Sequence, residues 1–548
     1  MNRRHFLFNA FRKKPLDELG VSEVNSDLTP YTGNWDTQQA VQLLRRTVFG
    51  ASKAQINQVL ALGMSSAVDT LLTVQTAPSP PLNNYITDPL TPDPNVPIGQ
   101  TWVNAPFDTL YNPARRNSYK SWWIGLMFNQ GLTITEKMTL FWHNHLATEL
   151  NVFDIAQFAY DYSVILRQHG LGNFKTMVHQ ITTCPAMLRY LNGAQNTQTA
   201  PDENYARELQ ELFTIGKDLT PSFTEADVQA AARVLTGYRI NATTMDYYFD
   251  PTKHDTGNKQ FSSFYSDTLI TGQTGANGAL ELDALLDMIF AHPEVAKFVC
   301  RKLYRFFVYY QITPDVETNI ILPLADIFRN GNYEISPVLS ALFKSQHFYD
   351  MAILSCHIKN PLDFTIGLCR ELSVPIPAPS VSTEYKAYSR INSNTSNMQM
   401  NLADPPSVSG WPAYYQDPLF HETWLNTDSY ARRMEFIEIL SENGHFVDSG
   451  GYRLKANFVT YVATYDTPDD PNLLIDEAIQ LLYTFEVTQT FKDYLKSFLL
   501  SGQTSDYYWS DAWNTYINNP TTANFNTVNT RLKAMFKYLL SQAEYQIC

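Results

Sequence analysis

Apolar residues recur every three or four positions along most of this chain, and this spacing constrains the fold more than any other feature. One example is TQQAVQLLRRTVFGASKAQINQVLALGMSSAVDTLL, which starts at Thr37, and another is TEKMTLFWHNHLATEL, residues 135–150. A period near 3.6 residues places apolar side chains on one face of a helix, which must then be buried against other helices. The sequence therefore predicts a mainly α fold, a globular array of many helices.

The helical spacing breaks between residues 238 and 272. Tyr238 and Ile240 precede a turn-prone NATTMD segment, and Tyr247 and Phe249 follow it. Aromatic and β-branched residues on both sides of a turn are typical of paired strands. We expect a small β-hairpin or flap near 238–272.

The chain has 548 residues, which is long enough for several cores, because a domain usually takes roughly 100–200 residues. We divide it into an N-terminal segment (1–36), a main helical domain (37–373) that carries the flap, and a C-terminal helical region (374–548) packed on the main domain. Residues 374–399 are rich in Pro, Ser and Asn, and they are predicted to form an irregular excursion at this boundary.

Acidic residues outnumber basic ones by 54 to 40, which gives a net charge of −14. This charge disfavours binding to nucleic acid through a broad basic surface. No apolar run reaches the roughly 18 residues that a spanning helix needs, so no transmembrane segment is expected. The five cysteines are widely spaced without a C-x-x-C pair, which argues against a disulfide scaffold or a zinc finger.

The first residues, MNRRHFLFNAFRKKP, contain Arg3 and Arg4 in a pattern that looks like the core of a twin-arginine export signal. The basic residues Arg12, Lys13 and Lys14 follow before an apolar run of about 7–15 residues can develop. A complete signal peptide is therefore not expected, and the sequence leaves export open.

Residues 141–146, FWHNHL, place polar side chains in a helix that is otherwise apolar almost all round. At about 100° per residue, the rings of His143 and His145 lie roughly 200° apart, each among apolar neighbours. A buried imidazole needs a hydrogen-bond acceptor, a carboxylate or a metal. The plainer interpretation is a hydrogen-bonded core histidine. The alternative is a metal ligand, although one intact turn cannot offer both rings to a single ion.

Residues 203–216, ENYARELQELFTIG, are predicted to form an amphipathic helix. Arg207 follows Glu203 by four positions, which is the spacing of an ion pair on a helix surface. Glu208 lies at the border between the apolar and polar faces. An ordinary surface helix explains most of this pattern. The functional alternative makes Glu208 a catalytic carboxylate and metal ligand, with Arg207 stabilising an anion.

The proposed flap contains FDPTKHDTGNK, residues 249–259, in which a His-Asp pair and two lysines occupy a loop. Functional residues concentrate on such loops. His254 could act as a general base or metal ligand, Asp255 could orient its ring, and Lys259 could stabilise an anion. A turn held together by Asp side chains is the plainer alternative.

Together these segments define a candidate site assembled from separate elements, as helical proteins build metal and acid–base sites. A divalent metal is a candidate cofactor, and a haem on a lone histidine ranks below it because there is no C-x-x-C-H motif. The chain also lacks H-E-x-x-H, G-x-S-x-G, Walker A and G-x-G-x-x-G motifs, which disfavours the common zincin, α/β-hydrolase and nucleotide-binding classes. The predicted catalytic residues are Glu208, His254, Asp255, Arg207 and Lys259, and the predicted metal ligands are His143, His145, Glu208 and His254.

The same segments resemble a bacterial family known as domain of unknown function 1800. The likeness runs through QLLRRTVFGAS (42–52), TEKMTLFWHNHL (135–146), ENYARELQELFTIG (203–216), TEADVQAAARVLTGY (224–238), FDPTKHDTGNK (249–259), IKNPLDF (358–364) and DPPSVSGWPAYY (404–415). The resemblance implies a protein of the periplasm or cell envelope. It also implies a protein partner from the domain of unknown function 1501 family, which resembles the sulfatase and alkaline phosphatase superfamily. It implies no particular activity.

Two functions are compatible with these observations. The first is a metal-assisted or acid–base hydrolase acting on cell-envelope polymers or their modifications. The second is a non-catalytic helical scaffold or partner protein of the bacterial envelope. An enzyme requires His143 or His145, Glu208 and His254 around an open cavity, whereas a scaffold would hold them in separate, saturated contacts. Trp411, in the 404–415 segment, is expected to pack as a core plug rather than to cover a site.

Overall fold

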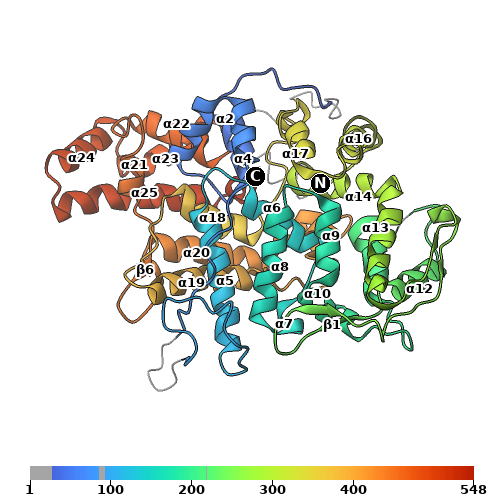
Figure 1. Cartoon of the computed structure of the whole chain (residues 1–548). Coiled ribbons are helices and arrows are strands. Elements are labelled where there is room, and N and C mark those ends of the chain that lie inside the picture. The colour runs from blue at the N-terminus through green and yellow to red at the C-terminus, as the bar shows by residue number, and fades with distance from the viewer. Residues whose placement is uncertain (1–26, 86–92, 218) are drawn as a thin grey trace.

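The computed structural model describes residues 27–85, 93–217 and 219–548, and the export-like Arg3 and Arg4 lie outside these ranges. The chain folds into an array of helices, which confirms the predicted mainly α class (Figure 1). None of the helices in the described ranges is long and apolar enough to cross a membrane. The longer helices up to residue 373 are α2 (Thr37–Thr47), α3 (Lys53–Leu62), α4 (Met64–Leu71), α5 (Asn112–Asn129), α6 (Thr135–His145), α8 (Ala156–His169), α9 (Phe174–Thr183), α10 (Pro185–Tyr190), α12 (Glu225–Val234), α13 (Glu281–Ala291), α14 (Glu294–Phe307), α16 (Leu322–Asn330), α17 (Ile335–Phe343) and α18 (Pro361–Glu371). The later ones are α19 (Val381–Asn397), α20 (Thr427–Ser441), α21 (Phe458–Val462), α22 (Pro471–Leu482), α23 (Gln489–Leu500), α24 (Tyr507–Asn518) and α25 (Thr522–Ser541).

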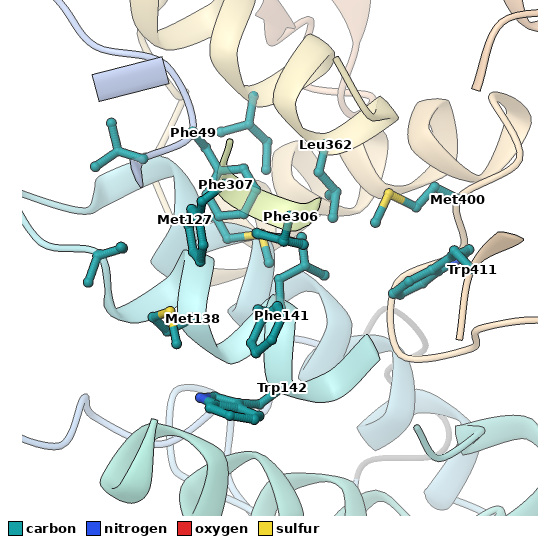
Figure 2. Packing of buried hydrophobic residues seen from close by; sticks show 14 of the residues in the cluster. Phe49, Met127, Met138, Phe141, Trp142, Phe306, Phe307, Leu362, Met400 and Trp411 are labelled. Carbon is teal, nitrogen blue, oxygen red and sulfur yellow. The ribbon is translucent and has the colours of Figure 1, made fainter. Parts of the chain in front are cut away.

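Helix α6 lies near the centre of the molecule and is buried along nearly its whole length, as its apolar pattern predicts (Figure 1). The ring of Phe141 packs edge-on against Phe306 of α14, with centroids 5.2 Å apart, in the aromatic cluster that Figure 2 shows from close by. Glu136 is also buried, and its carboxylate accepts hydrogen bonds of 2.8 and 2.9 Å from Arg167 of α8. Lys137, the next residue, is also buried and pairs with Asp363 of α18, so both buried charges near the start of α6 are paired as they are removed from water.

The prediction of a single helix over 135–150 is wrong at its C-terminal end, because α6 stops at His145. The amide of Leu150 donates to the carbonyl of Ala403 at 3.0 Å instead of continuing the helix. A short helix, α7 (Leu150–Phe153), begins there. The amide of Asn151 donates to Asp404 Oδ1 at 2.7 Å, so the start of the 404–415 segment is attached to α7.

The prediction of one regular helix over 203–216 also needs correction. Helix α11 (Asn204–Glu208) passes directly into η3 (Leu209–Thr214), a π-helical segment in which the amide of Ile215 donates to the carbonyl of Gln210 at 2.9 Å. The Gln210 side chain is buried and accepts a hydrogen bond of 2.7 Å from the Tyr265 hydroxyl. Such π-helical turns are rare and occur frequently at functional sites.

The predicted flap consists of two short antiparallel hairpins. In the first, β1 (Tyr238–Ile240) pairs with β2 (Tyr247–Phe249), and in the second β3 (Lys259–Gln260) pairs with β4 (Leu269–Ile270). The third two-stranded sheet of the described chain joins β5 (His445–Phe446) to β6 (Arg453–Leu454). A mainly α fold with a small β element near 238–272 is therefore confirmed.

The second hairpin is anchored to α12 through one buried carboxylate. Asp227 forms a capping box with Thr224 at the start of α12. The same side chain accepts two further hydrogen bonds of 2.7 Å, from the amide and the hydroxyl of Ser262. The position of the flap is thus fixed by the helix cap itself.

Residues 374–399, predicted to be irregular, contain the 17-residue helix α19 (Val381–Asn397). The hydroxyl of Ser380 caps its first turn by accepting a hydrogen bond from the amide of Thr383 at 3.2 Å. The helix packs along α5, where the Tyr388 ring lies over Gly125. The prediction is wrong because Ser and Asn disfavour an isolated helix, whereas packing against another helix overrides their intrinsic preference.

The C-terminal helices contact the rest of the chain through α19 on α5 and through α22 on α2. Across the second contact, Arg45 of α2 donates to the carbonyl of Leu482 at the end of α22. In Figure 1, α21 to α25 lie on one side of the molecule and the flap with α12 and α13 on the other, with α5, α6 and α8 between them. The domain boundary between residues 373 and 374 stays a prediction.

Replacing Gly125 by Ala tests the α5–α19 contact. We expect a loss of about 1–3 kcal/mol in the free energy of unfolding, as for other overpacked sites, although Ala is the better helix former. A Cβ at Gly125 would lie 2.8 Å from the ring of Tyr388, whose hydroxyl is hydrogen bonded to Asn129 and Glu384 and leaves the ring little freedom to move. Urea denaturation measures the change. Gly131→Ala is the control, because its added Cβ would meet nothing within 4 Å, and equal effects of the two variants would contradict this account.

Candidate functional site: a cationic pocket beside helix α6

His143 is buried in the aromatic core. Its ring centroid lies 5.4 Å from that of Trp123, 5.7 Å from Tyr162 and 6.0 Å from Trp411. Burial, together with the charge of Lys120, lowers the pKa of His143 to about 3, so the ring is neutral near pH 7. Trp411 is itself only 1% exposed, which confirms its predicted role as a core plug.

His145 projects from another side of α6 and lines a pocket. Its Nε2 lies 2.9 Å from the carbonyl oxygen of Phe213 near the end of η3, where backbone carbonyls lack intrahelical partners. Burial, followed by the charge of Lys302, lowers the pKa of His145 to about 3. The neutral ring must carry its proton on Nε2, because a carbonyl can only accept, and this leaves Nδ1 as an acceptor. The two histidines have different neighbours, in agreement with their predicted angular separation.

His254 and Lys259 hold the carboxylate of Glu281 in a buried ion cluster. His254 Nε2 lies 3.0 Å from Glu281 Oε1, and Lys259 Nζ lies 2.6 Å from Oε2. The other nitrogen of His254 lies 2.9 Å from the carbonyl oxygen of Thr236, so both ring nitrogens have partners. Burial alone would raise the pKa of Glu281, but the hydrogen bonds from His254 and Lys259 lower it below its ordinary value. The cluster therefore locks the flap onto α13.

Asp255 and Arg207 also lie in ion pairs within the protein. Asp255 accepts a hydrogen bond of 2.8 Å from Arg233 of α12. Arg207 donates to Glu225 at 2.7 and 2.8 Å and to Glu203 at 3.1 Å. The Arg207–Glu203 contact is the i,i+4 ion pair that the sequence predicts.

Glu208 is half-buried at the end of α11, and burial together with the charge of Glu211 raises its pKa above the ordinary value. His143, His145 and His254 occupy three different environments. Across residues 27–85, 93–217 and 219–548, no group of three or more His, Cys, Asp and Glu side chains is arranged to hold a metal. The assignment of these residues as ligands and catalytic groups stays a prediction.

A pocket of about 260 Å³ opens beside His145, between α6, η3, α14 and residues 409–415. The last of these elements is fixed to α6, because the amide of Trp411 donates to Asn144 Oδ1 at 2.8 Å. Only glycine fits at position 410, where φ is +87° and a Cβ would lie 2.3 Å from Asn144 Oδ1. Three of the family-like segments, 135–146, 203–216 and 404–415, thus contribute walls to one pocket. Its charged and polar lining includes Asn144, His145, Glu211, Lys217, Lys302 and Arg305.

Positive charge dominates this pocket, because Lys217, Lys302 and Arg305 face a single carboxylate, that of Glu211. Lys217 lies 4.0 Å from Glu211. Lys302 Nζ lies 5.3 Å from the ring centre of Phe298, and no carboxylate in the described ranges pairs with it. Burial, with the charges of Arg305 and Lys217, lowers the pKa of Lys302 to about 8. An uncompensated, partly desolvated cation in a concave site marks a candidate functional residue.

The sequence patterns did not single out Lys302, Arg305, Glu211 or Lys217. Lys302 and Arg305 belong to KFVCRKLYRFF, residues 297–307, where basic residues alternate with apolar ones as on any amphipathic helix. Basic residues in such a pattern are normally solvated. Only the packing of α14 against α6 and η3 shows that these two line a pocket.

The chain belongs to a defined protein family. The chain matches the family described as Protein of unknown function (DUF1800) over residues 42–547, and it is therefore a member of that family, as the resemblance predicts. No curated protein and no solved structure matches the chain.

Replacing Glu281 by Ala tests whether the flap cluster is structural. The change leaves Lys259 and His254 buried without their carboxylate, so we expect a loss of about 3–5 kcal/mol in the free energy of unfolding. Asp283→Ala on the same helix is the control, because the Asp283 side chain is 60% exposed. Urea denaturation at pH 7 measures the free energy of unfolding of both variants. A small and equal loss for both would show that the cluster contributes little to the fold.

Replacing Lys302 by Met tests whether the positive charge of Lys302 lacks a partner of opposite charge in the folded protein. The pKa of Lys302 in the folded protein, about 8, lies below the ordinary value of 10.5. The charged lysine therefore destabilises the folded state by its full amount below pH 8, and this destabilisation disappears as the pH rises towards 10.5. We therefore expect Lys302→Met to increase the free energy of unfolding at pH 7 by up to about 3 kcal/mol, with a smaller gain at pH 10. The exposed Lys253→Met is the control. A Lys302→Met variant less stable than the wild type at pH 7 would reveal a stabilising ion pair instead.

Proposed function

We propose that this protein is an acid–base hydrolase whose active site is the pocket beside His145, and that it acts on polymers of the cell envelope or on their modifications. The observation that carries the proposal is Lys302, a partly desolvated cation that pairs with no carboxylate of the described ranges and shares the wall of one pocket with Glu211. The envelope as the location of the substrate is supported by the resemblance described above.

In the proposed reaction, Glu211 accepts a proton from a water molecule as its oxygen bonds to the reacting centre. Lys302 donates its ammonium proton to the departing oxygen as the bond to that oxygen breaks. A pKa of about 8 suits this role, because the group is mostly protonated at pH 7 and still gives up its proton readily. Solvent then returns a proton from Glu211 to Lys302, so both residues recover their starting charge.

The remaining side chains of the pocket position the reactants. Arg305 and Lys217 would stabilise negative charge that develops on the substrate, which is the role predicted above for Arg207 and Lys259. The neutral ring of His145 offers Nδ1 as a fixed acceptor for water or a substrate hydroxyl. The pKa of Glu208 is raised by burial and by the charge of Glu211. We propose that Glu208 lies beside the general base, Glu211, and does not bind a metal.

The acid–base form of the hydrolase is favoured over the metal-assisted form by the hydrogen bonds of one predicted ligand. Both ring nitrogens of His254 are used, one by Glu281 and the other by Thr236. Recruitment of His254 to a metal would break one of these buried contacts and would disturb the paired Lys259.

The non-catalytic scaffold or envelope partner remains the second candidate, and a specific observation favours it. His254, Asp255, Lys259 and Arg207 all lie in ion pairs or hydrogen bonds within the chain, as expected of residues that hold elements together. In this case the proposed partner is a sulfatase-like protein of the domain of unknown function 1501 family.

Replacing Glu211 by Gln tests the hydrolase directly. Wild-type protein is incubated with purified envelope polymers, including peptidoglycan and lipopolysaccharide, and released fragments are identified by mass spectrometry. We expect Glu211→Gln to reduce the rate of release by about 10²-fold or more, because general-base catalysis typically contributes that much. Glu435→Gln, at a side chain that is 56% exposed, is the control and should keep the wild-type rate. If wild-type protein releases nothing from any polymer, the scaffold becomes the better proposal.

A further inference from the structure

We propose that the pocket beside His145 binds a dianionic phosphoryl group through Lys302, Arg305 and Lys217, so that the substrates are phosphate monoesters. The inference deepens the proposed function and rests on it for the reaction, because it names the substrate class of the same pocket. The binding step itself depends only on the charges and donors that line the walls.

The charge of the lining matches a dianion. Three cationic side chains and one carboxylate face the space, so two positive charges are left for a ligand to neutralise. Lys217 is associated with Glu211 at 4.0 Å, which leaves Lys302 and Arg305 as the two cations that no carboxylate of the lining compensates, although Asp417 and Glu317 act on Arg305 from outside the lining. A monoanion would leave one of these desolvated charges without a counterion, which is costly in a site of low polarity.

The donors are also placed for an oxyanion. Lys302 Nζ lies over the face of the Phe298 ring, 5.3 Å from its centre, and it donates no hydrogen bond to any residue of the described ranges, so its three protons can be offered to a ligand. Within the described ranges, Arg305 donates through Nε to the carbonyl oxygen of Tyr310 at 3.3 Å and its guanidinium lies 5.5 Å from the ring centre of Phe420, while its terminal nitrogens donate to no described acceptor. Lysine and arginine are the side chains that recognise phosphate oxygens most effectively.

The size and lining of the pocket favour a terminal ester over a long segment of polymer. A volume of about 260 Å³ is slightly below the usual lower limit of small-molecule sites, about 300 Å³. The aromatic rings of Phe298, Tyr414 and Tyr415 complete the walls and offer an apolar surface for the group that carries the phosphate.

Hydrolysis of such an ester balances with the residues already assigned. The oxygen of water forms a bond to phosphorus, and its proton passes to Glu211. The bond between phosphorus and the ester oxygen breaks, and the leaving oxygen takes its proton from Lys302. The products are an alcohol and inorganic phosphate, and no further reactant is required. Phosphoryl transfer depends mainly on positioning and on compensation of charge, which a cationic pocket supplies.

Sulfate is the probe for binding, because it is a dianion throughout the pH range used. Isothermal titration of the whole protein at pH 7 should show saturable binding at one site, with acetate binding more weakly. Lys302→Met should weaken sulfate binding by about tenfold or more, as expected for the loss of a charge-assisted hydrogen bond. Lys253→Met, which changes an exposed lysine, should leave the affinity unchanged. Absence of saturable binding, equal affinity in Lys302→Met, or tighter binding of acetate would overturn the inference.

The pH dependence of the sulfate affinity distinguishes the contribution of Lys302 from that of the other charged and titratable groups that line the pocket. These are Arg305, Lys217, Glu211 and His145, and the lowered pKa of His145, about 3, keeps that ring neutral over the range used. Sulfate affinity should fall between pH 7 and pH 9 in the wild type, as Lys302 loses its proton near pH 8. Lys302→Arg keeps its charge at both pH values, so its affinity should not change. A wild-type affinity that is constant over this range would overturn the assignment.

The inference and the proposed function can fail separately. Lys302→Arg should bind sulfate but should not hydrolyse glycerol 2-phosphate, because its alkoxide leaving group needs a proton and arginine cannot donate one. Saturable sulfate binding in a wild-type protein that hydrolyses no ester would support the phosphoryl site and contradict the hydrolase. Hydrolysis of an uncharged envelope polymer without sulfate binding would support the hydrolase and overturn the phosphoryl site.

Discussion

The burial of α6 is the constraint on which the rest of the structure depends. A helix that is enclosed on all sides must satisfy most of its polar side chains within the protein, although Nδ1 of His143 has no hydrogen-bond partner in the described ranges. Asn144 does so by accepting the amide of Trp411, and His145 by donating to the carbonyl of Phe213. These two hydrogen bonds attach residues 404–415 and the π-helical segment η3 to the same end of α6. The pocket lies between those two attachments, so the requirements of a buried helix also shape the candidate site.

The end of η3 shows how a local irregularity can serve this arrangement. A π-helical turn displaces the following carbonyls from their α-helical positions, and Phe213 then presents its oxygen to His145 rather than to a backbone amide. The imidazole replaces the missing intrahelical donor. Because the pKa of His145 is lowered to about 3, the contact keeps the same protonation at any pH near neutrality. The wall of the pocket is therefore held by a bond that does not change with ordinary shifts of pH.

Periodicity predicted the mainly α fold, the burial of α6 and the separation of its two histidines, because those properties depend only on the spacing of side chains along one helix. It failed where distant segments decide the outcome. Helix α19 forms from a Ser- and Asn-rich stretch because α5 packs against it, and the regular helix expected over 203–216 is interrupted by η3. His254 and Lys259 look catalytic in the sequence, but Glu281, which lies more than twenty residues further on, is buried against both. Lys302 and Arg305 look like ordinary surface residues until α14 is placed beside α6.

Two buried lysines show why pairing, more than burial, distinguishes the candidate site from the supporting structure. Lys259 is fully buried, yet the carboxylate of Glu281 lies 2.6 Å away and compensates its charge. Lys302 is less enclosed, but the charges nearest to it include Arg305 and Lys217, which repel it and help to lower its pKa. A fold that needed only stability would place a carboxylate beside Lys302 or replace it with an apolar residue. An uncompensated cation at the edge of an otherwise well-paired core is best explained by the binding of an anionic ligand beside Lys302.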